Sequence, residues 1–278
     1  IDRGQAVSFE EYSELLQHLA DMAVLNLTLT GGEPLVHPDF FAIGNRAREL
    51  GFVIRVKSNG HLIRGEAAKR MVDEVDPYQI DLSLHGATAA THDRQTRTAG
   101  SFASLMQNID QMKRLGLRLK LICTITAWNE HEIEEILDFT NRLGIPANFI
   151  ASVSPKDNGD FGPLQIAPSP EGMKKLAHLL EERHQANQPD DLDTPAKTNA
   201  NKPSLHVKRH CGAGSSSLTI DQWGNVFPCV QWRRKVGNIR QKAISEIWSN
   251  SKELNTVRDM TITAKDVAAR FSGPKTAT

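Results

Sequence analysis

Residues 26 to 35 read Asn-Leu-Thr-Leu-Thr-Gly-Gly-Glu-Pro-Leu, and they decide the fold class of this 278-residue chain. Leucines at positions 25, 27 and 29 alternate with polar residues, which is the two-residue period of a β-strand. Gly31 and Gly32 then allow a ligand to come close to the main chain. Glu33 follows at the carboxyl end of the strand, where parallel α/β proteins collect their active sites, and its carboxylate can accept hydrogen bonds from an ammonium group. An ordinary strand-to-helix turn is the alternative interpretation of the same residues.

Four more strand-like segments follow, and each is succeeded by helical or turn signals. Ser8 with Glu11 predicts a capped helix before the first strand, and Asn129 with Glu132 predicts the opening of a later one. This repeated βα plan predicts parallel strands joined by helical crossovers. Periodicity alone does not choose between an open doubly wound sheet and a barrel. The expected strands lie within residues 53–59, 79–86, 117–126 and 147–153.

Composition restricts the class of protein. Hydrophobic residues make up 39% of the chain and charged residues 24%, which is typical of a globular protein that is not embedded in a membrane. Lysine plus arginine equals aspartate plus glutamate at 33 each, so no basic surface for nucleic acid is expected. The sequence shows neither an apolar stretch long enough to span a bilayer nor a secretory signal. Three cysteines do not make a disulfide framework and favour the reducing cytoplasm.

A polar, proline-containing stretch at residues 185–204 interrupts the globular pattern and predicts a linker. The expected organisation is therefore a core over residues 1–186, a linker over 187–204 and a second module over 205–278.

A second informative segment runs from Cys211 to Cys229. Short strand-like runs flank residues 221–224, whose final glycine suits a hairpin turn, and the hairpin can bring both thiols to one end. Two converging thiolates can bind iron or zinc, whereas two unrelated buried cysteines are the alternative. Cys123 lies inside an expected strand and is predicted to be a core residue.

The turn at residues 31–34 resembles the S-adenosylmethionine (SAM) contacting turn of radical SAM enzymes, whose cores are partial (β/α)6 barrels. The spacing of Cys211, Gly224 and Cys229 is similar to the opening of a SPASM domain. The resemblance implies an α/β fold with a partial TIM-like barrel that lacks its first strand, followed by a small hairpin and helix module. It also implies SAM, a catalytic [4Fe–4S] cluster and an auxiliary iron–sulfur cluster as cofactors, with Cys211 and Cys229 among the ligands of the auxiliary cluster.

The same resemblance suggests cofactor contacts one position at a time. Ser58 and Asn59 match a strand-end turn near the SAM site, Ser83 matches a serine that contacts SAM, and Arg97 is similar to an arginine that pairs with the SAM carboxylate. The alternatives are an ordinary turn, a serine that satisfies backbone groups and a surface charge. His85 stands where many relatives have aspartate. The implied cofactor-binding set is Gly31, Gly32, Glu33, Pro34, Ser58, Asn59, Ser83 and Arg97.

The loop at residues 154–164 resembles a substrate-proximal loop of peptide maturases, which makes Lys156, Asp157 and Asp160 candidate substrate contacts, while simple loop flexibility is the alternative. One departure from the family is severe: these 278 residues lack both the three-cysteine motif that holds the catalytic cluster and the later SPASM cysteines. The interpretation is a fragment that is inactive as given, or a cysteine-free descendant, and no catalytic residue is assigned.

The resemblance implies that the intact protein cleaves SAM reductively to a 5′-deoxyadenosyl radical and modifies a peptide after translation. Alternatives are an enzyme like the sulfatase maturases, a cofactor-biosynthetic radical SAM enzyme, or a non-catalytic module that binds SAM or a peptide. The expected partners are a peptide or protein substrate and an electron donor such as flavodoxin or ferredoxin, with neither nucleic acid nor membrane involved.

Overall fold

The computed structural model describes residues 4–156, 159–186 and 211–271. Its contacts divide the chain into one unit of residues 23–191 and another of residues 1–22 together with 192–278. The linker predicted over residues 187–204 lies outside the described residues, and the predicted domain boundaries stay a prediction.

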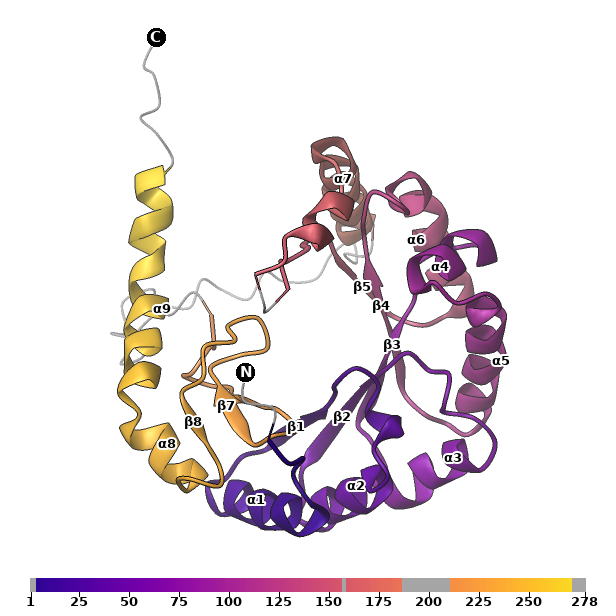
Figure 1. The fold of residues 1–278 in the computed structure, drawn as a ribbon. Coiled ribbons are helices and arrows are strands. Elements are labelled where there is room, and N and C mark those ends of the chain that lie inside the picture. The colour runs from indigo at the N-terminus through magenta and orange to yellow at the C-terminus, as the bar shows by residue number, and fades with distance from the viewer. Residues whose placement is uncertain (1–3, 157–158, 187–210, 272–278) are drawn as a thin grey trace, which may run out of the picture. The chain divides into compact units, whose positions relative to one another are not determined.

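The first unit is built on a five-stranded parallel sheet in the order β1-β2-β3-β4-β5, so that every strand pairs with its neighbour in sequence. Figure 1 shows helices α2 to α6 along one face of this sheet. The predicted α/β plan of parallel strands joined by helices is confirmed. The strands are β1 (Asn26–Leu29), β2 (Val53–Ser58), β3 (Gln79–Ser83), β4 (Leu119–Thr124) and β5 (Ala147–Ile150). The helices are α2 (Phe40–Glu49), α3 (Gly65–Arg70), α4 (Ala89–Thr96), α5 (Ser101–Arg114), α6 (Ile133–Leu143) and α7 (Pro170–Ala186), with short helices η1 (Pro34–Val36), η2 (Met71–Val75), η3 (Glu130–Glu132) and η4 (Gly162–Ile166).

The core of this unit lies between the central strands and the helices. Ile80 and Leu82 of β3 and Leu105 of α5 are completely buried. Ile80 and Leu82 alternate with polar residues along β3, so they lie on the same face of the sheet. Gly60 shows how close the layers come: its φ is +80°, and a Cβ there would lie 2.6 Å from Cδ1 of Leu105. Only glycine combines this backbone conformation with this approach.

The second unit joins α1 (Phe9–Asp21) to the C-terminal segment. Strands β6 (Thr219–Ile220) and β7 (Asn225–Phe227) pair antiparallel, and β8 (Gly237–Asn238) pairs with β7. The hairpin predicted around residues 221–224 is therefore confirmed, and Gly224 has a φ of +77° at its turn. Helices α8 (Ile244–Asn250) and α9 (Lys252–Phe271) follow. One apolar cluster holds the unit together, with Leu15 of α1 packed among residues Val226, Val236, Ile244, Ile247 and Leu254.

A charged contact fastens the start of α1 to this unit. Arg240 donates hydrogen bonds to both carboxylate oxygens of Glu11, at 2.5 and 2.7 Å, and to the carbonyl oxygens of Gln5 and Ala6. Glu11 also closes the predicted capping box with Ser8, which is confirmed. These hydrogen bonds, first that from Arg240, lower the pKa of Glu11 to about 2. Within the described ranges, no helix has both the length and the apolarity needed to cross a membrane.

Candidate functional site

Glu33, Ser58 and Ser83 lie at the carboxyl ends of three adjacent strands, β1, β2 and β3. Since parallel strands all point the same way, their carboxyl ends share one edge of the sheet. The local fold thus brings side chains that are 25 residues apart in sequence to neighbouring strand ends.

Glu33 and Ser58 are directly bonded. The Ser58 hydroxyl lies 2.9 and 3.0 Å from the two carboxylate oxygens of Glu33, and the Asn59 backbone N–H donates to Oε2 at 2.8 Å. Ser58 is buried, and its oxygen also accepts from the Gly60 N–H at 2.9 Å. The predicted residues Glu33, Ser58 and Asn59 therefore form one hydrogen-bonded group that fixes the Glu33 carboxylate.

The main chain beside this carboxylate is open. Gly31 and Gly32 are exposed, and no heavy atom lies within 4 Å of the position that a Cβ would take at either residue. Pro34 is buried at the first position of η1 and ends the turn. A ligand can therefore approach the turn closely, and its ammonium group can meet a carboxylate that is already oriented. The residues present fit the methionine end of SAM.

Two stacked histidines, His85 just after β3 and His92 in α4, were not placed in the site by sequence reasoning. His85 and His92 lie with ring centroids 5.8 Å apart, and the His85 backbone N–H donates to Nδ1 of His92 at 3.1 Å. Burial lowers the pKa of each imidazole to about 4. Ser83, two residues earlier, is half-buried, and its side chain makes no hydrogen bond to the part of the chain that the structure describes.

The loops after β3 and β4 are joined by two polar side chains, the buried Asn129 and the half-buried Glu132. Asn129 donates through Nδ2 to the carbonyl oxygens of His85 and Thr124, both at 2.9 Å, and accepts from the Thr126 N–H at 2.7 Å. The Glu132 carboxylate accepts from the Ala87 N–H at 3.1 Å and from the hydroxyls of two threonines, Thr88 and Thr91. The predicted helix opening is present, because η3 begins directly after Asn129 and α6 directly after Glu132, but neither side chain makes a capping hydrogen bond. Both instead bind the loop after the neighbouring strand.

Neither Arg97 nor the predicted substrate loop is seen in contact with the Glu33 group among the described residues. Arg97 is exposed at the C-terminus of α4, with a left-handed φ of 56°, and no contact in the structure connects it with Glu33 or Ser58 over the described residues. In the loop after β5, Lys156 is paired with Asp160 at 2.7 Å, while Asp157 lies outside the described residues. The structure leaves the substrate role of this loop a prediction.

The three cysteines differ in environment. Cys123 is completely buried in β4, and burial raises the pKa of its thiol to about 12, so the prediction of a core residue is confirmed. Cys211 is exposed and Cys229 half-buried. The Gly214 N–H donates to the Pro228 carbonyl at 3.0 Å, which ties the chain near one cysteine to the chain near the other. Among the described residues no group of three or more His, Cys, Asp or Glu side chains could hold a metal ion, so this pair is a partial ligand set at most.

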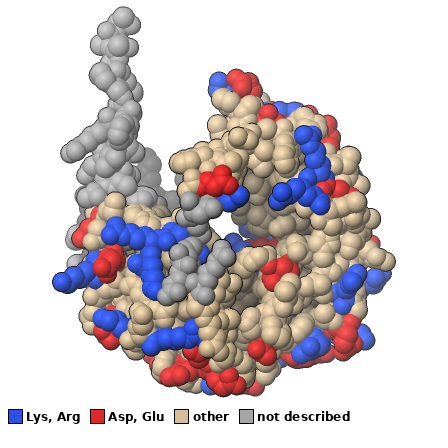
Figure 2. All heavy atoms as spheres, viewed as in Figure 1, with Lys and Arg blue, Asp and Glu red and all other residues tan. Residues whose placement is uncertain are grey.

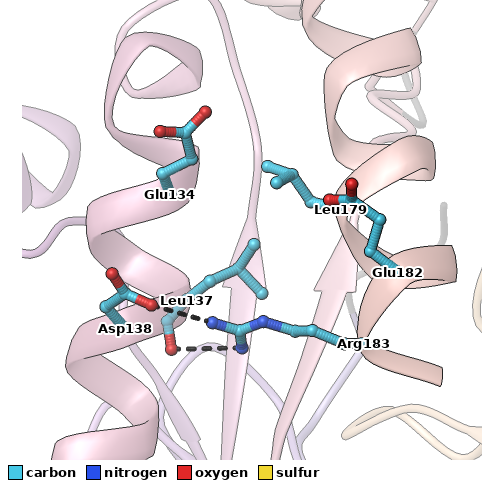
Figure 3. Close-up of a pocket in the computed structure, with 6 residues that line it drawn as sticks. All are labelled: Glu134, Leu137, Asp138, Leu179, Glu182 and Arg183. Carbon is cyan, nitrogen blue, oxygen red and sulfur yellow. Dashed lines mark hydrogen bonds and ion pairs between the residues drawn. The ribbon is translucent and has the colours of Figure 1, made fainter. Parts of the chain in front are cut away.

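A groove of about 370 Å³ lies between α6 and α7 and contains none of the predicted site residues (Figure 3). Arg183 crosses it and donates to the carbonyl of Leu137 at 3.2 Å and to Asp138 at 3.1 Å. Over the face in Figure 2, basic and acidic side chains are interspersed and neither sign dominates.

Comparison with known protein families gives two matches. The model of the Radical SAM superfamily matches residues 1–140, and that of the SPASM iron–sulfur cluster-binding domain matches residues 211–270.

Curated relatives are of two kinds. A pre-heme d1 synthase from Dinoroseobacter shibae is 28% identical over 85% of this chain and 64% of its own length. An AdoMet-dependent heme synthase from Methanosarcina barkeri is 25% identical over 90% of this chain and 75% of its own length. The mycofactocin maturase MftC of Mycobacterium tuberculosis is 24% identical over 93% of this chain and 66% of its own length.

Solved structures share the fold. Streptococcus suis SuiB has a TM-score of 0.68 at 16% identity over 93% of this chain, and anSMEcpe with bound AdoMet has a TM-score of 0.67 at 15% identity over 94%. The chain spans 63% of the SuiB chain and 76% of the anSMEcpe chain. The predicted partial barrel with a C-terminal module is confirmed.

Proposed function

Because the chain belongs to the Radical SAM superfamily, we propose that the protein modifies a peptide after translation, with SAM and iron–sulfur clusters as cofactors. The cofactors supply one-electron chemistry that removes a hydrogen atom from the substrate. The protein's own task is to bind and orient cofactor and substrate and to keep water away from them.

The observation that carries the proposal is the Glu33 group. Its carboxylate is held by Ser58 and Asn59 beside the open main chain of Gly31 and Gly32. A fixed carboxylate beside exposed main chain suits the ammonium of SAM, since charge-assisted hydrogen bonds are about twice as strong as neutral ones. We assign Pro34 to the shape of this turn, and Ser83 and Arg97 to further contacts with the cofactor.

The cysteines of this chain supply only some of the ligands that the iron–sulfur clusters need. Cys211 and Cys229 are proposed as two ligands of an auxiliary iron–sulfur cluster. The remaining cysteine, Cys123, is buried in the sheet, so the three cysteines of these residues do not fit a catalytic cluster that needs three thiolates. No role in the first cluster is therefore given to any residue of this chain.

A peptide substrate is supported by relatives that act on peptides. MftC is a maturase, AlbA of Bacillus subtilis is a biosynthesis protein for the bacteriocin subtilosin, and SuiB has been crystallised bound to its precursor peptide. A second candidate substrate is a tetrapyrrole, because several matched relatives are heme or pre-heme d1 synthases. Flavodoxin or ferredoxin is proposed as the electron donor.

Two titrations of the chain test the proposal. Calorimetry with SAM should show one saturable site, and absence of heat would remove the SAM site. Titration with heme, followed by its Soret absorbance, distinguishes the substrates, because a tetrapyrrole enzyme should shift the band stoichiometrically and a peptide enzyme should not.

A further inference from the structure

His85 occupies an unusual environment at the end of β3. Both of its main-chain polar groups are bound by buried side chains: its N–H by Nδ1 of His92 and its carbonyl by Nδ2 of Asn129. His92 is 1% exposed and Asn129 is 0% exposed. Two buried polar residues thus fix the position of one backbone unit. Such restraint of a residue by packed partners is typical of a site that must be held in one geometry.

The imidazole of His85 has no such partner. Its Nδ1 is fully buried and makes no hydrogen bond within the described residues, although the residue as a whole is partly exposed. At Nδ1, a buried N–H without an acceptor costs more free energy than a buried nitrogen without a proton. The ring proton of His85 therefore belongs on Nε2. His92 has the same tautomer, because its Nδ1 accepts the bond from His85. The two rings stack, and burial keeps both uncharged at neutral pH. His85 therefore offers a neutral donor.

We propose that His85 is a specificity-determining residue of the site and donates a hydrogen bond from Nε2 to an uncharged oxygen, a carbonyl or hydroxyl, of the bound ligand. His92 and Asn129 are its positioning residues. The inference rests on the proposed function, since it takes the carboxyl edge of the sheet to be the place where SAM and the peptide bind. The oxygen can belong to either molecule.

The experiment compares two variants of the full chain. His85→Phe keeps the ring and its stacking on His92 but removes both nitrogens. His85→Gln keeps a neutral N–H near the place of Nε2. Because His85→Phe also removes an unsatisfied buried nitrogen, its melting temperature should equal or exceed that of the wild type. Its affinity for the ligand should fall about two- to tenfold, the effect of one neutral hydrogen bond, and His85→Gln should restore most of it.

Two arms separate the sources of the oxygen. In the first, calorimetry with SAM alone gives the affinity of each variant. In the second, spectra of chain labelled with ¹⁵N-histidine follow the Nε2 resonance of His85, first with SAM and then with added acetyl-tetraglycine amide as a carbonyl-bearing probe. Loss of SAM affinity in His85→Phe assigns the oxygen to the cofactor, whereas an Nε2 shift seen only with the peptide assigns it to the substrate.

Two results would contradict the role proposed for His85. Unchanged SAM affinity together with an unmoved Nε2 resonance overturns the proposal, and so does a His85→Phe chain that melts several degrees lower, which would make His85 a structural residue. The wild-type titration tests the proposed function separately, because it asks only whether SAM binds.

Discussion

At the scale of single residues, the main result is that Glu33 and Ser58, which were predicted separately to contact the cofactor, are hydrogen-bonded to each other. The resemblance of short motifs named Glu33 and Ser58 separately, but it carried no information that the Ser58 hydroxyl lies 2.9 Å from the Glu33 carboxylate. The strands that bear them are adjacent only in the folded sheet. Their proposed roles are therefore linked: Ser58 orients the Glu33 carboxylate, and we propose that this carboxylate supplies the charge that binds the SAM ammonium.

Glu33→Gln should weaken binding of SAM by about 1.5 to 3 kcal/mol, because the amide removes the charge from the hydrogen bonds to the ammonium group. Calorimetric titration measures the loss. Ser58→Ala is the matched control, which keeps the charge but releases the carboxylate, and its loss should be smaller. Equal affinity of Glu33→Gln and wild type would remove Glu33 from the SAM site.

Two glycines with the same backbone conformation allow the cost of overpacking to be measured separately from the cost of a left-handed backbone. Gly60 and Gly51 have φ values of +80° and +81°, but a Cβ meets Leu105 and Leu82 at residue 60 and nothing within 4 Å at residue 51. Gly51→Ala should cost about 1 to 2 kcal/mol of unfolding free energy for the left-handed backbone. Gly60→Ala should cost about 1 to 3 kcal/mol more because of overpacking. Urea denaturation checks both, and equal losses would contradict the close approach.

At the scale of elements, short sequence patterns correctly predicted the features that depend on residues close together in the chain. The strands, the hairpin and the Ser8 capping box follow from alternation, a turn glycine and a three-residue spacing, and all are present. The spacing of Asn129 and Glu132 has the same appearance as a cap, yet their partners lie on the loop after β3. Sequence spacing does not distinguish a polar side chain that caps its own helix from one that binds a distant loop. For this reason the sequence did not predict the environment of His85.

The attachment of α1 predicts a pH dependence. The pKa of Glu11 is lowered to about 2 in the folded chain, mainly by Arg240, against about 4.3 for an unperturbed glutamate. A lowered pKa means that the stabilisation is present above the unfolded value and is lost as the pH falls from about 4.3 towards 2. The difference in melting temperature between wild type and Glu11→Gln should therefore be present at pH 7 and shrink in that range.

The control for this measurement is Glu74→Gln. Glu74 forms an exposed ion pair with Arg70 within one helical segment, at 2.5 Å, whereas the Glu11 pair joins residues 229 positions apart. Exposed pairs between helical neighbours contribute little to stability. Two results would contradict the role of Arg240. The loss of melting temperature in Glu11→Gln could be no larger than that in Glu74→Gln, or it could be the same at every pH.

At the scale of the whole molecule, the described contacts place the first helix with the last segment. Leu15 shares an apolar cluster with Val226 and Leu254, and Arg240 binds the chain that leads into α1. Sequence patterns locate elements in order along the chain, and they do not show that residues near 15 and near 250 share a core. The cysteine-bearing hairpin is thus supported by a helix from the other end of the described chain.

This support makes Cys211 and Cys229 a testable pair. Their segments are joined by the Gly214 to Pro228 hydrogen bond, and the Trp232 N–H donates to Sγ of Cys229 at 3.2 Å. Added Co²⁺ should therefore produce sulfur-to-metal charge-transfer absorbance that disappears in Cys211→Ala and in Cys229→Ala. Cys123→Ala should keep it, because burial raises the pKa of that thiol to about 12 and leaves it protonated. Since metal binding couples to folding, Co²⁺ should also slow hydrogen exchange in β7 and α8 of the wild type and of Cys123→Ala alone. Equal absorbance in all three variants would show that the two cysteines do not bind one metal.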